Sequence, residues 1–155
     1  MSLPWGGAGG WSLGDFGLAG NAAGAIGLDI YLSNALAQPY PNSVDISNFN
    51  FNRYASAAEV KVIEMSGCLG WCGAPGKPTY FTTDEYSSKT RAQNMLSLPS
   101  TPDYRVNFYA VPGTWAIGPE PVLPDYGYDG GGTQYYSPGA VYVDRDTLTV
   151  TPLGP

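Results

Sequence analysis

The stretch Ile46–Gly67, ISNFNFNRYASAAEVKVIEMSG, holds signals for a strand, a turn and a helix in direct succession. Its first half alternates asparagine with larger side chains, which is typical of a strand whose side chains point to two faces in turn. This alternation predicts a strand over Ile46–Tyr54 with Phe49, Phe51 and Arg53 on one face. A guanidinium among phenylalanines needs a partner for its charge.

The second half of this stretch begins with a helix-capping signal. Ser56 and Glu59 have the spacing of a capping box, in which the serine caps the first turn. A helix is therefore expected from Ser56 to about Ser66, and Gly67 suits the left-handed position that follows a helix. The chain thus passes from strand to arginine to tight turn to helix.

The residues after this unit predict a mixed fold. The expected helix begins at Ser87 or Ser88 and ends near Leu96, and Pro112–Asp129 is expected to be a long loop because it is rich in proline and glycine. The further expected strands lie at Thr79–Thr83, Tyr104–Val111, Thr133–Ser137, Ala140–Val143 and Thr147–Thr151. This order predicts an α+β fold with small, mainly antiparallel sheets and short helices.

The N-terminal part has a different composition. Nine glycines fall within the first 27 residues, and ordering them would cost backbone entropy with little burial in return. Residues 1–24 are therefore expected to be a flexible leader, with a short helix over Ala25–Leu36 before Pro39 and Pro41. We divide the chain into a leader, residues 1–45, and a folded domain, residues 46–155.

Charge and composition exclude several classes of function. The net charge of −6 argues against a nucleic-acid partner and against an anionic membrane surface. The sequence has no apolar stretch of membrane-spanning length and no secretory signal, so any export would depend on a carrier. The chain has no histidine, which excludes Ser-His-Asp and Cys-His catalysis. We expect no metal cofactor.

The two cysteines of the chain are Cys68 and Cys72. Two thiolates without histidine do not complete a four-ligand zinc site. A disulfide between them would close a very short loop, so we expect two reduced thiols in a loop.

Two short stretches carry polar groups suited to binding. Gly130–Tyr135, GGGTQY, is either a plain turn or a segment that lets the backbone approach a ligand closely, with the Gln134 amide at its end. The expected strand with Tyr80, Thr82 and Thr83 places hydroxyls beside aromatic rings, although these residues are equally typical of an ordinary strand.

Taken together and in this order, these stretches resemble a known group of toxins. The strand with Arg53, its capped helix, Tyr80–Tyr86 (YFTTDEY), Leu96–Pro99 (LSLP) and Gly130–Tyr135 are similar to C-terminal toxin domains of Rhs and related polymorphic toxins. Those domains have an ADP-ribosyltransferase-like split fold of two small sheets. The GGGTQY motif in particular resembles that of TNT-type NAD glycohydrolases.

The resemblance implies that NAD is the substrate and lies in a cleft between the sheets. Arg53 would hold the NAD phosphates or the nicotinamide ribose, and Gln134 would take the position of the transferases' catalytic glutamate. Arg53 and Gln134 are therefore expected to meet across one groove. Residues expected to line the NAD site are Tyr54, Tyr80, Thr82, Thr83, Tyr86, Gly131 and Gly132.

The resemblance also implies a biological setting. The domain would be delivered as part of a larger secreted protein and would act in the cytoplasm of a recipient cell, with a cognate immunity protein as partner. The start of the domain favours mono-ADP-ribosylation of a target protein. Gln134, an amide where a carboxylate is usual, favours NAD hydrolysis instead. Of the two we expect transfer to a protein, with hydrolysis of NAD as the alternative. A non-catalytic binding module is the third hypothesis.

Overall fold

The computed structural model describes residues 43–70 and 77–155. The expected flexible leader over residues 1–24 and the expected helix over residues 25–36 lie outside the described residues, as does Cys72. The first described element is strand β1 (Ser43–Asp45), which pairs antiparallel with β6 (Trp115–Pro121). These three residues lie at the end of the expected leader, residues 1–45, and they pair with a strand of the domain.

The domain is a mixed α+β structure in which the paired strands run antiparallel. The other elements are, in chain order, β2 (Asn50–Ala55), α2 (Ala57–Ser66), β3 (Cys68–Leu69), β4 (Thr79–Phe81), α3 (Lys89–Leu96), β5 (Tyr104–Tyr109), β7 (Thr133–Ser137), β8 (Val141–Tyr142), the 3-10 helix η2 (Arg145–Thr147) and β9 (Thr149–Pro152). The expected α+β class with small antiparallel sheets and short helices is confirmed at this level.

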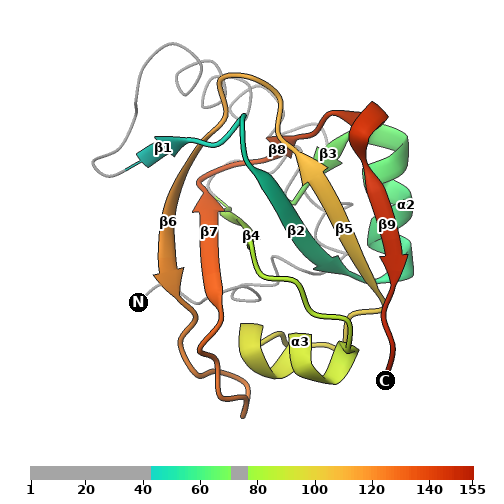
Figure 1. Ribbon diagram of the computed structural model, residues 1–155, viewed down its shortest axis with the longest axis vertical. Helices are drawn as coiled ribbons and strands as arrows, with labels where there is room; N and C mark the ends of the chain where they lie inside the picture. Colours follow the sequence, from blue (N-terminus) through green and yellow to red (C-terminus); the bar gives the residue numbers. More distant parts are fainter. Residues whose placement is uncertain (1–42, 71–76) are drawn as a thin grey trace.

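The strands form a four-stranded sheet in the order β1-β6-β7-β4, a three-stranded sheet in the order β2-β5-β9, and the pair β3-β8. A bridge between Asn52 and Thr82 joins the two larger sheets, with N–O distances of 2.7 and 2.9 Å between their backbones. Figure 1 shows β4 and β2 next to each other at this junction. The two sheets therefore continue into one another as a single bent sheet.

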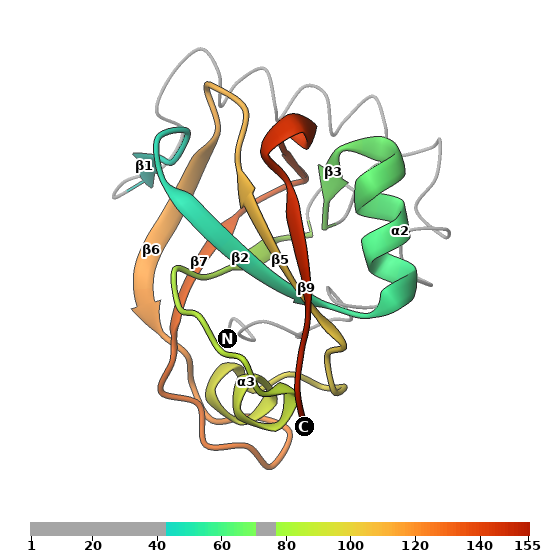
Figure 2. The ribbon, with the colours of Figure 1, turned by 45° about the vertical axis from the view of Figure 1, so that its right-hand side comes forward.

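Two hydrophobic cores lie on the two faces of this bent sheet. The inner core holds Phe51, Phe81 and Phe108 together with Val60 and Ile63 of α2. The second core, which we call the α3 core, lies on the opposite face of the sheet and includes residues of α3. Its buried members are Tyr54, Tyr80, Tyr86, Ala92, Leu96, Leu98, Val122 and Leu153. Figure 2 shows α2 beside the sheet and α3 beneath it.

The serine caps and the glycine after α2 agree with the signals of the sequence, whereas the Glu59 carboxylate pairs with Arg53 and so does not complete the capping box. Ser56 caps α2 by accepting the Glu59 N–H at 3.2 Å, and Gly67 follows with a φ of +69°. Ser88 caps α3 by accepting the Arg91 N–H at 3.2 Å. These two serines confirm the predicted helix starts, because the signal that defines a cap lies within four residues of sequence.

Strand β6 contradicts the prediction that residues 112–129 form one long loop. Its prolines are accommodated without breaking the ladder, because the register shifts between Ile117 and Glu120 and so removes Pro119 from regular pairing. Pro121 lies at the end of the strand.

The prediction of two reduced thiols in a loop is also wrong. Cys68 is disulfide-bonded and lies in β3.

Candidate functional site

Arg53, expected to bind the NAD phosphates or the nicotinamide ribose, lies on β2 with an exposed fraction of 0%. Its Nε donates to Oε2 of Glu59 at 2.5 Å, and its Nη1 donates to the carbonyl oxygen of Tyr80 at 2.8 Å. The expectation that this arginine needs a partner is confirmed, and Glu59 is that partner. The ion pair connects β2 with the first turn of α2, and the bond to Tyr80 connects β2 with β4.

Arg53 and Gln134 extend from opposite faces of the bent sheet. Arg53 is opposite Val106 in register and on the same side of β2 as Phe51, which is the side of the inner core. Gln134 precedes Tyr135, whose ring contacts Phe51 at 5.0 Å between centroids, so Gln134 points away from the inner core. The structure therefore does not bring these two side chains together, and the candidate site is the surface around Gln134.

Gln134 instead forms a pair with a carboxylate that the sequence did not single out. Its Nε2 donates to Oε1 of Glu120 at 3.2 Å across the β6–β7 ladder, where the two residues are register partners. Gln134 is 4% exposed, and its own Oε1 has no hydrogen-bond partner. Glu120 is half-buried. The site thus combines an unpaired amide oxygen with a carboxylate.

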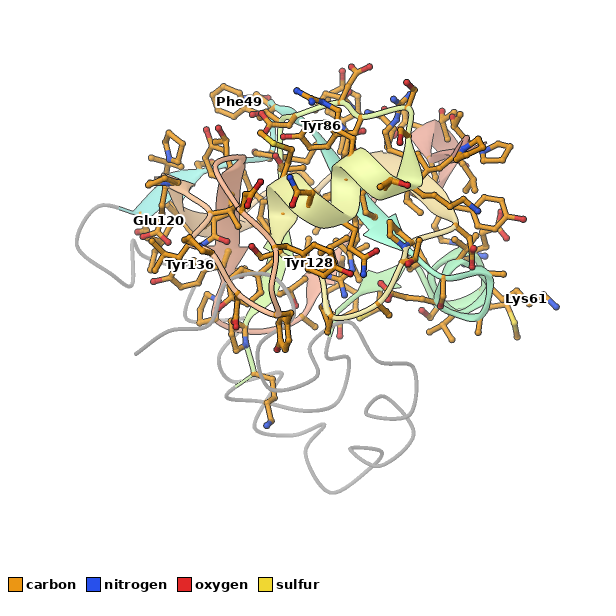
Figure 3. The ribbon with its side chains drawn as sticks, turned by 90° about the horizontal axis from the view of Figure 1, so that it is seen from below. Phe49, Lys61, Tyr86, Glu120, Tyr128 and Tyr136 are labelled. Carbon is orange, nitrogen blue, oxygen red and sulfur yellow. The ribbon has the colours of Figure 1, made fainter. Side chains whose placement is uncertain are left out.

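Two tyrosines lie on the same face as this pair. Tyr136 follows Gln134 by two residues, and its ring centroid is 5.6 Å from that of Tyr80, its register partner on β4. Burial, and secondarily the charge of Glu120, raise the pKa of the Tyr136 hydroxyl above its ordinary value. In Figure 3 the labelled side chains of Glu120 and Tyr136 lie next to each other. Tyr80, expected to line the NAD site, is thus on the Gln134 face.

The remaining predicted residues of the YFTTDEY stretch have different environments. Thr82 is fully buried, and its Oγ1 accepts the Asp84 N–H at 2.9 Å, whereas Thr83 is exposed. The Tyr54 hydroxyl donates to the carbonyl oxygen of Asp84 at 3.0 Å and accepts the Tyr86 N–H at 2.6 Å. Tyr54 and Tyr86 therefore hold the Asp84 segment against the sheet.

Burial governs the acidity of these two tyrosines. It raises the pKa of Tyr54 to about 12, and the neighbouring charges of Asp84 and Glu85 contribute in the same direction. Burial, a hydrogen bond to Asp84 and the Asp84 charge raise the pKa of Tyr86 as well. Both hydroxyls therefore remain protonated and act as donors at neutral pH.

The backbone N–H groups of the three glycines of GGGTQY all donate to carbonyl oxygens of the protein, so they are not available to bind a phosphate. The N–H groups of Gly130 and Gly132 donate to the carbonyl oxygens of Asn94 and Met95 at 2.9 and 3.0 Å, and that of Gly131 donates to Val122 at 2.9 Å. A Cβ on Gly132 would approach the Met95 carbonyl oxygen to 2.9 Å. Gly132 therefore serves close packing against α3, and the amides of Gly131 and Gly132, which were expected to line the NAD site, are bonded within the protein.

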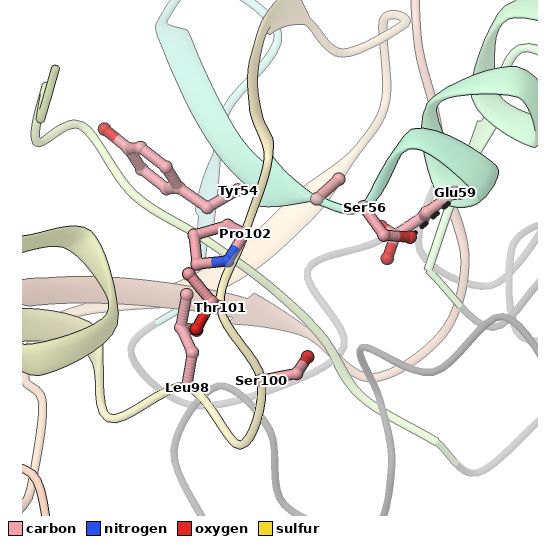
Figure 4. A pocket seen from close by; sticks show the side chains of 8 residues that line it. Tyr54, Ser56, Glu59, Leu98, Ser100, Thr101 and Pro102 are labelled. Carbon is pink, nitrogen blue, oxygen red and sulfur yellow. Dashed lines mark hydrogen bonds between the residues drawn. The ribbon is translucent and has the colours of Figure 1, made fainter. Parts of the chain in front are cut away.

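A small cavity of about 20 Å³ lies beside the buried ion pair. Figure 4 shows its lining, which includes Tyr54, Ser56, Glu59, Leu98, Ser100, Thr101 and Pro102. Burial raises the pKa of Glu59, the Arg53 charge opposes this, and the Oε1 of Glu59 has no hydrogen-bond partner. The volume suits about one water molecule and is far below that of a nicotinamide ring.

Two kinds of feature are absent from residues 43–70 and 77–155. These residues contain no cluster of three or more acidic or cysteine side chains placed to hold a metal ion. They also contain no helix long and apolar enough to cross a membrane. In comparisons with known proteins, no protein-family model, no curated protein and no solved structure matches this chain.

Proposed function

We propose that this domain cleaves the bond between nicotinamide and ribose in NAD and transfers the ADP-ribose to water. The observation that carries this proposal is the pair of Gln134 and Glu120, in which a buried amide with an unpaired oxygen lies against a half-buried carboxylate. The aromatic rings of Tyr136 and Tyr80 lie on the same face of the sheet as the pair. An amide, a carboxylate and aromatic rings suit a cationic substrate that needs no metal.

The chemistry requires stabilisation of positive charge at the ribose. When the bond between C1′ and the pyridinium nitrogen breaks, the electron pair leaves with neutral nicotinamide and the ribose becomes oxocarbenium-like. The Glu120 carboxylate would stabilise that charge, and the Gln134 amide, whose Nε2 donates to Glu120, would hold the carboxylate in position. Water then adds to C1′ and loses a proton, so that nicotinamide, ADP-ribose and one proton are the products.

Hydrolysis has better support than transfer to a protein. The preference for transfer depended partly on Arg53 as a ligand of NAD, and its fully buried guanidinium is held by Glu59 and the Tyr80 carbonyl. The GGGTQY motif, which contains Gln134, resembles that of NAD hydrolases. Mono-ADP-ribosylation of a target protein remains the second candidate, because Glu120 supplies the carboxylate that Gln134 lacks.

The proposed activity also suggests where the domain acts and which partner it needs. An enzyme that consumes NAD harms any cytoplasm that contains it, including that of the cell that makes it. We therefore propose that the domain acts as a toxin delivered into a recipient cell, and that an immunity protein protects the producer.

The test measures nicotinamide release from NAD by the purified protein, first alone and then with a bacterial lysate. Glu120→Gln and Gln134→Ala are expected to lower kcat/KM about 100-fold, which is the usual effect of removing one electrostatic stabiliser. Glu64→Gln makes the same change as Glu120→Gln on the exposed side of α2, and is expected to retain full activity.

Each other outcome contradicts a defined part of the proposal. Nicotinamide release only in the presence of lysate, with labelled ADP-ribose on a discrete band, would replace hydrolysis by transfer. Equal activity of Glu120→Gln and the wild-type protein would remove the amide–carboxylate pair from the site. The absence of NAD turnover under both conditions would contradict an enzymatic function and favour the hypothesis of a non-catalytic binding module.

A further inference from the structure

We infer that Asp84 is a positioning residue for Gln134, which it orients by binding the backbone immediately before it. Oδ2 of Asp84 accepts the Thr133 N–H at 2.7 Å, and Thr133 is the first residue of β7 and the neighbour of Gln134. The inference rests on the proposed function, because it assigns a role in the reaction of that same site. Asp84 is half-buried and lies in the segment between β4 and α3.

Asp84 is itself fixed by bonds from several segments of the chain. Its N–H donates to Thr82 Oγ1 at 2.9 Å, and its carbonyl oxygen accepts bonds from Asn52 Nδ2 and the Tyr54 hydroxyl, each at 3.0 Å. The Tyr86 hydroxyl donates to Oδ2 at 2.9 Å. Backbone and side chain are both held, so the carboxylate has a defined position from which to orient another group.

The segment that Asp84 holds needs such an anchor. Three consecutive glycines precede Thr133, and glycine loses more conformational freedom on ordering than any other residue. The amides of Gly130 and Gly132 are fixed by carbonyl oxygens of α3, and the Thr133 amide is fixed by Asp84. The bond to Asp84 is the one next to Gln134, and a bond to a charged acceptor is about twice as strong as a neutral one.

The consequence for the site is a defined direction of the Gln134 side chain. The backbone at Thr133 sets where β7 begins and thus how the Gln134 amide meets Glu120, its partner at 3.2 Å. Asp84 does not need to touch the substrate to affect the reaction, because a displacement of about 1 Å in a reacting group lowers a rate about 100-fold. Loss of the anchor is therefore expected to lower kcat while leaving KM nearly unchanged.

The experiment compares Asp84→Ala, Asp84→Asn and Glu85→Gln with the wild-type protein. Asp84→Ala is expected to lower kcat about 100-fold with KM within about twofold. Asp84→Asn keeps one oxygen as an acceptor but loses the charge, so an intermediate kcat, about one tenth of the wild-type value, is expected. Glu85→Gln removes the adjacent carboxylate, which is exposed and pairs with Arg105 at 3.5 Å, and is expected to retain full activity.

A second measurement tests the anchor independently of NAD turnover. Hydrogen exchange of the Thr133 amide, followed by NMR, is expected to be faster in both Asp84 variants than in the wild-type protein and unchanged in Glu85→Gln. If the wild-type protein cleaves no NAD, the proposed function fails, and the exchange rates still decide whether Asp84 holds Thr133. Wild-type kcat in Asp84→Asn, or unchanged exchange at Thr133, would overturn the inference even if Asp84→Ala does not fold.

Discussion

Arg53 and Glu59 form an ion pair that is completely enclosed by the protein, with Nε and Oε2 separated by 2.5 Å and both side chains 0% exposed. The pair joins the strand β2 to the helix that follows it after one turn. Removing two charges from water is costly, and their attraction repays that cost only while both partners are present. The pair is therefore a structural element whose disruption affects the whole fold.

The first prediction concerns Arg53→Ala, which leaves the Glu59 carboxylate buried without its partner. The free energy of unfolding is expected to fall by about 3–5 kcal/mol, which is the usual cost of breaking a buried pair. Urea denaturation followed by circular dichroism measures this change.

The double variant Arg53→Met with Glu59→Leu is the control for this prediction, because it removes both charges. It is expected to regain most of the lost stability and to retain NAD cleavage, since Arg53 faces the inner core and not Gln134. A stable double variant without activity would show instead that Arg53 contacts the substrate.

The second prediction concerns the glycines before β7. Gly132→Ala places a Cβ 2.9 Å from both the Met95 carbonyl oxygen and the Tyr86 hydroxyl, closer than carbon atoms approach oxygen in folded proteins. The melting temperature is expected to fall, with a loss of about 1–3 kcal/mol for overpacking against backbone.

Gly127→Ala provides the contrast, because Gly127 has a φ of +80° with no atom within 4 Å of the new Cβ, whereas Gly132 has no positive φ and a crowded Cβ position. Gly127→Ala is expected to cost about 1 kcal/mol for backbone strain alone. A loss for Gly132→Ala no larger than that for Gly127→Ala would mean that close packing against α3 does not explain why residue 132 is a glycine.

The third prediction is a dependence of stability on alkaline pH. The pKa of Tyr54 is about 12 in the folded protein and 10 in its unperturbed state, so its proton stabilises the fold fully below pH 10. This contribution is lost as the pH rises from 10 through 12, because the unfolded chain releases the proton first. Denaturation experiments across that range are expected to show decreasing stability.

Tyr54→Phe provides the control for the pH dependence. It is expected to be less stable than the wild-type protein at pH 7, since the Tyr86 N–H loses its acceptor. Its stability is expected to decrease less steeply between pH 10 and 12, with the remaining slope due in part to Tyr86, whose pKa is also raised. Parallel curves for the two proteins would contradict the assignment to Tyr54.

Local signals in the sequence predicted local structure well. The starts of α2 and α3 at Ser56 and Ser88, and strand β7 from Thr133 to Ser137, agree with expectation because caps and alternation are read from neighbouring residues. Strand β6 was missed because its prolines indicate a loop when read alone. Its strand conformation depends on β1 and β7, which are distant in sequence.

The candidate site was predicted only in part for the same reason. The alternation of side chains predicted that Arg53 shares a face with Phe51, and the charge of Arg53 required a partner. Alternation within one strand does not show which side of a different strand faces the same core. The pairing of Gln134 with Glu120 depends on a register shift between Ile117 and Glu120. No periodic pattern in a single sequence shows such a shift, so the carboxylate of the site could not be identified before the structure.

The fourth prediction concerns the tip of the hairpin between β6 and β7. Asp125 and Tyr128 exchange backbone hydrogen bonds of 3.2 and 2.8 Å across a two-residue turn, in which Tyr126 has a φ of +52° and Gly127 a φ of +80°. This turn type favours Asn-Gly, and a left-handed conformation costs an ordinary residue about 1–2 kcal/mol. Tyr126→Asn is therefore expected to stabilise the protein by about 1 kcal/mol.

This gain corresponds to a rise in melting temperature of about 4 °C for a domain of this size, measured by differential scanning calorimetry. Tyr126 is 44% exposed, so its ring is only partly buried. Tyr128→Asn removes an aromatic ring from the same turn at a residue without positive φ, and no stabilisation is expected. If Tyr126→Asn lowers the melting temperature, contacts of the tyrosine side chain outweigh the strain of its backbone.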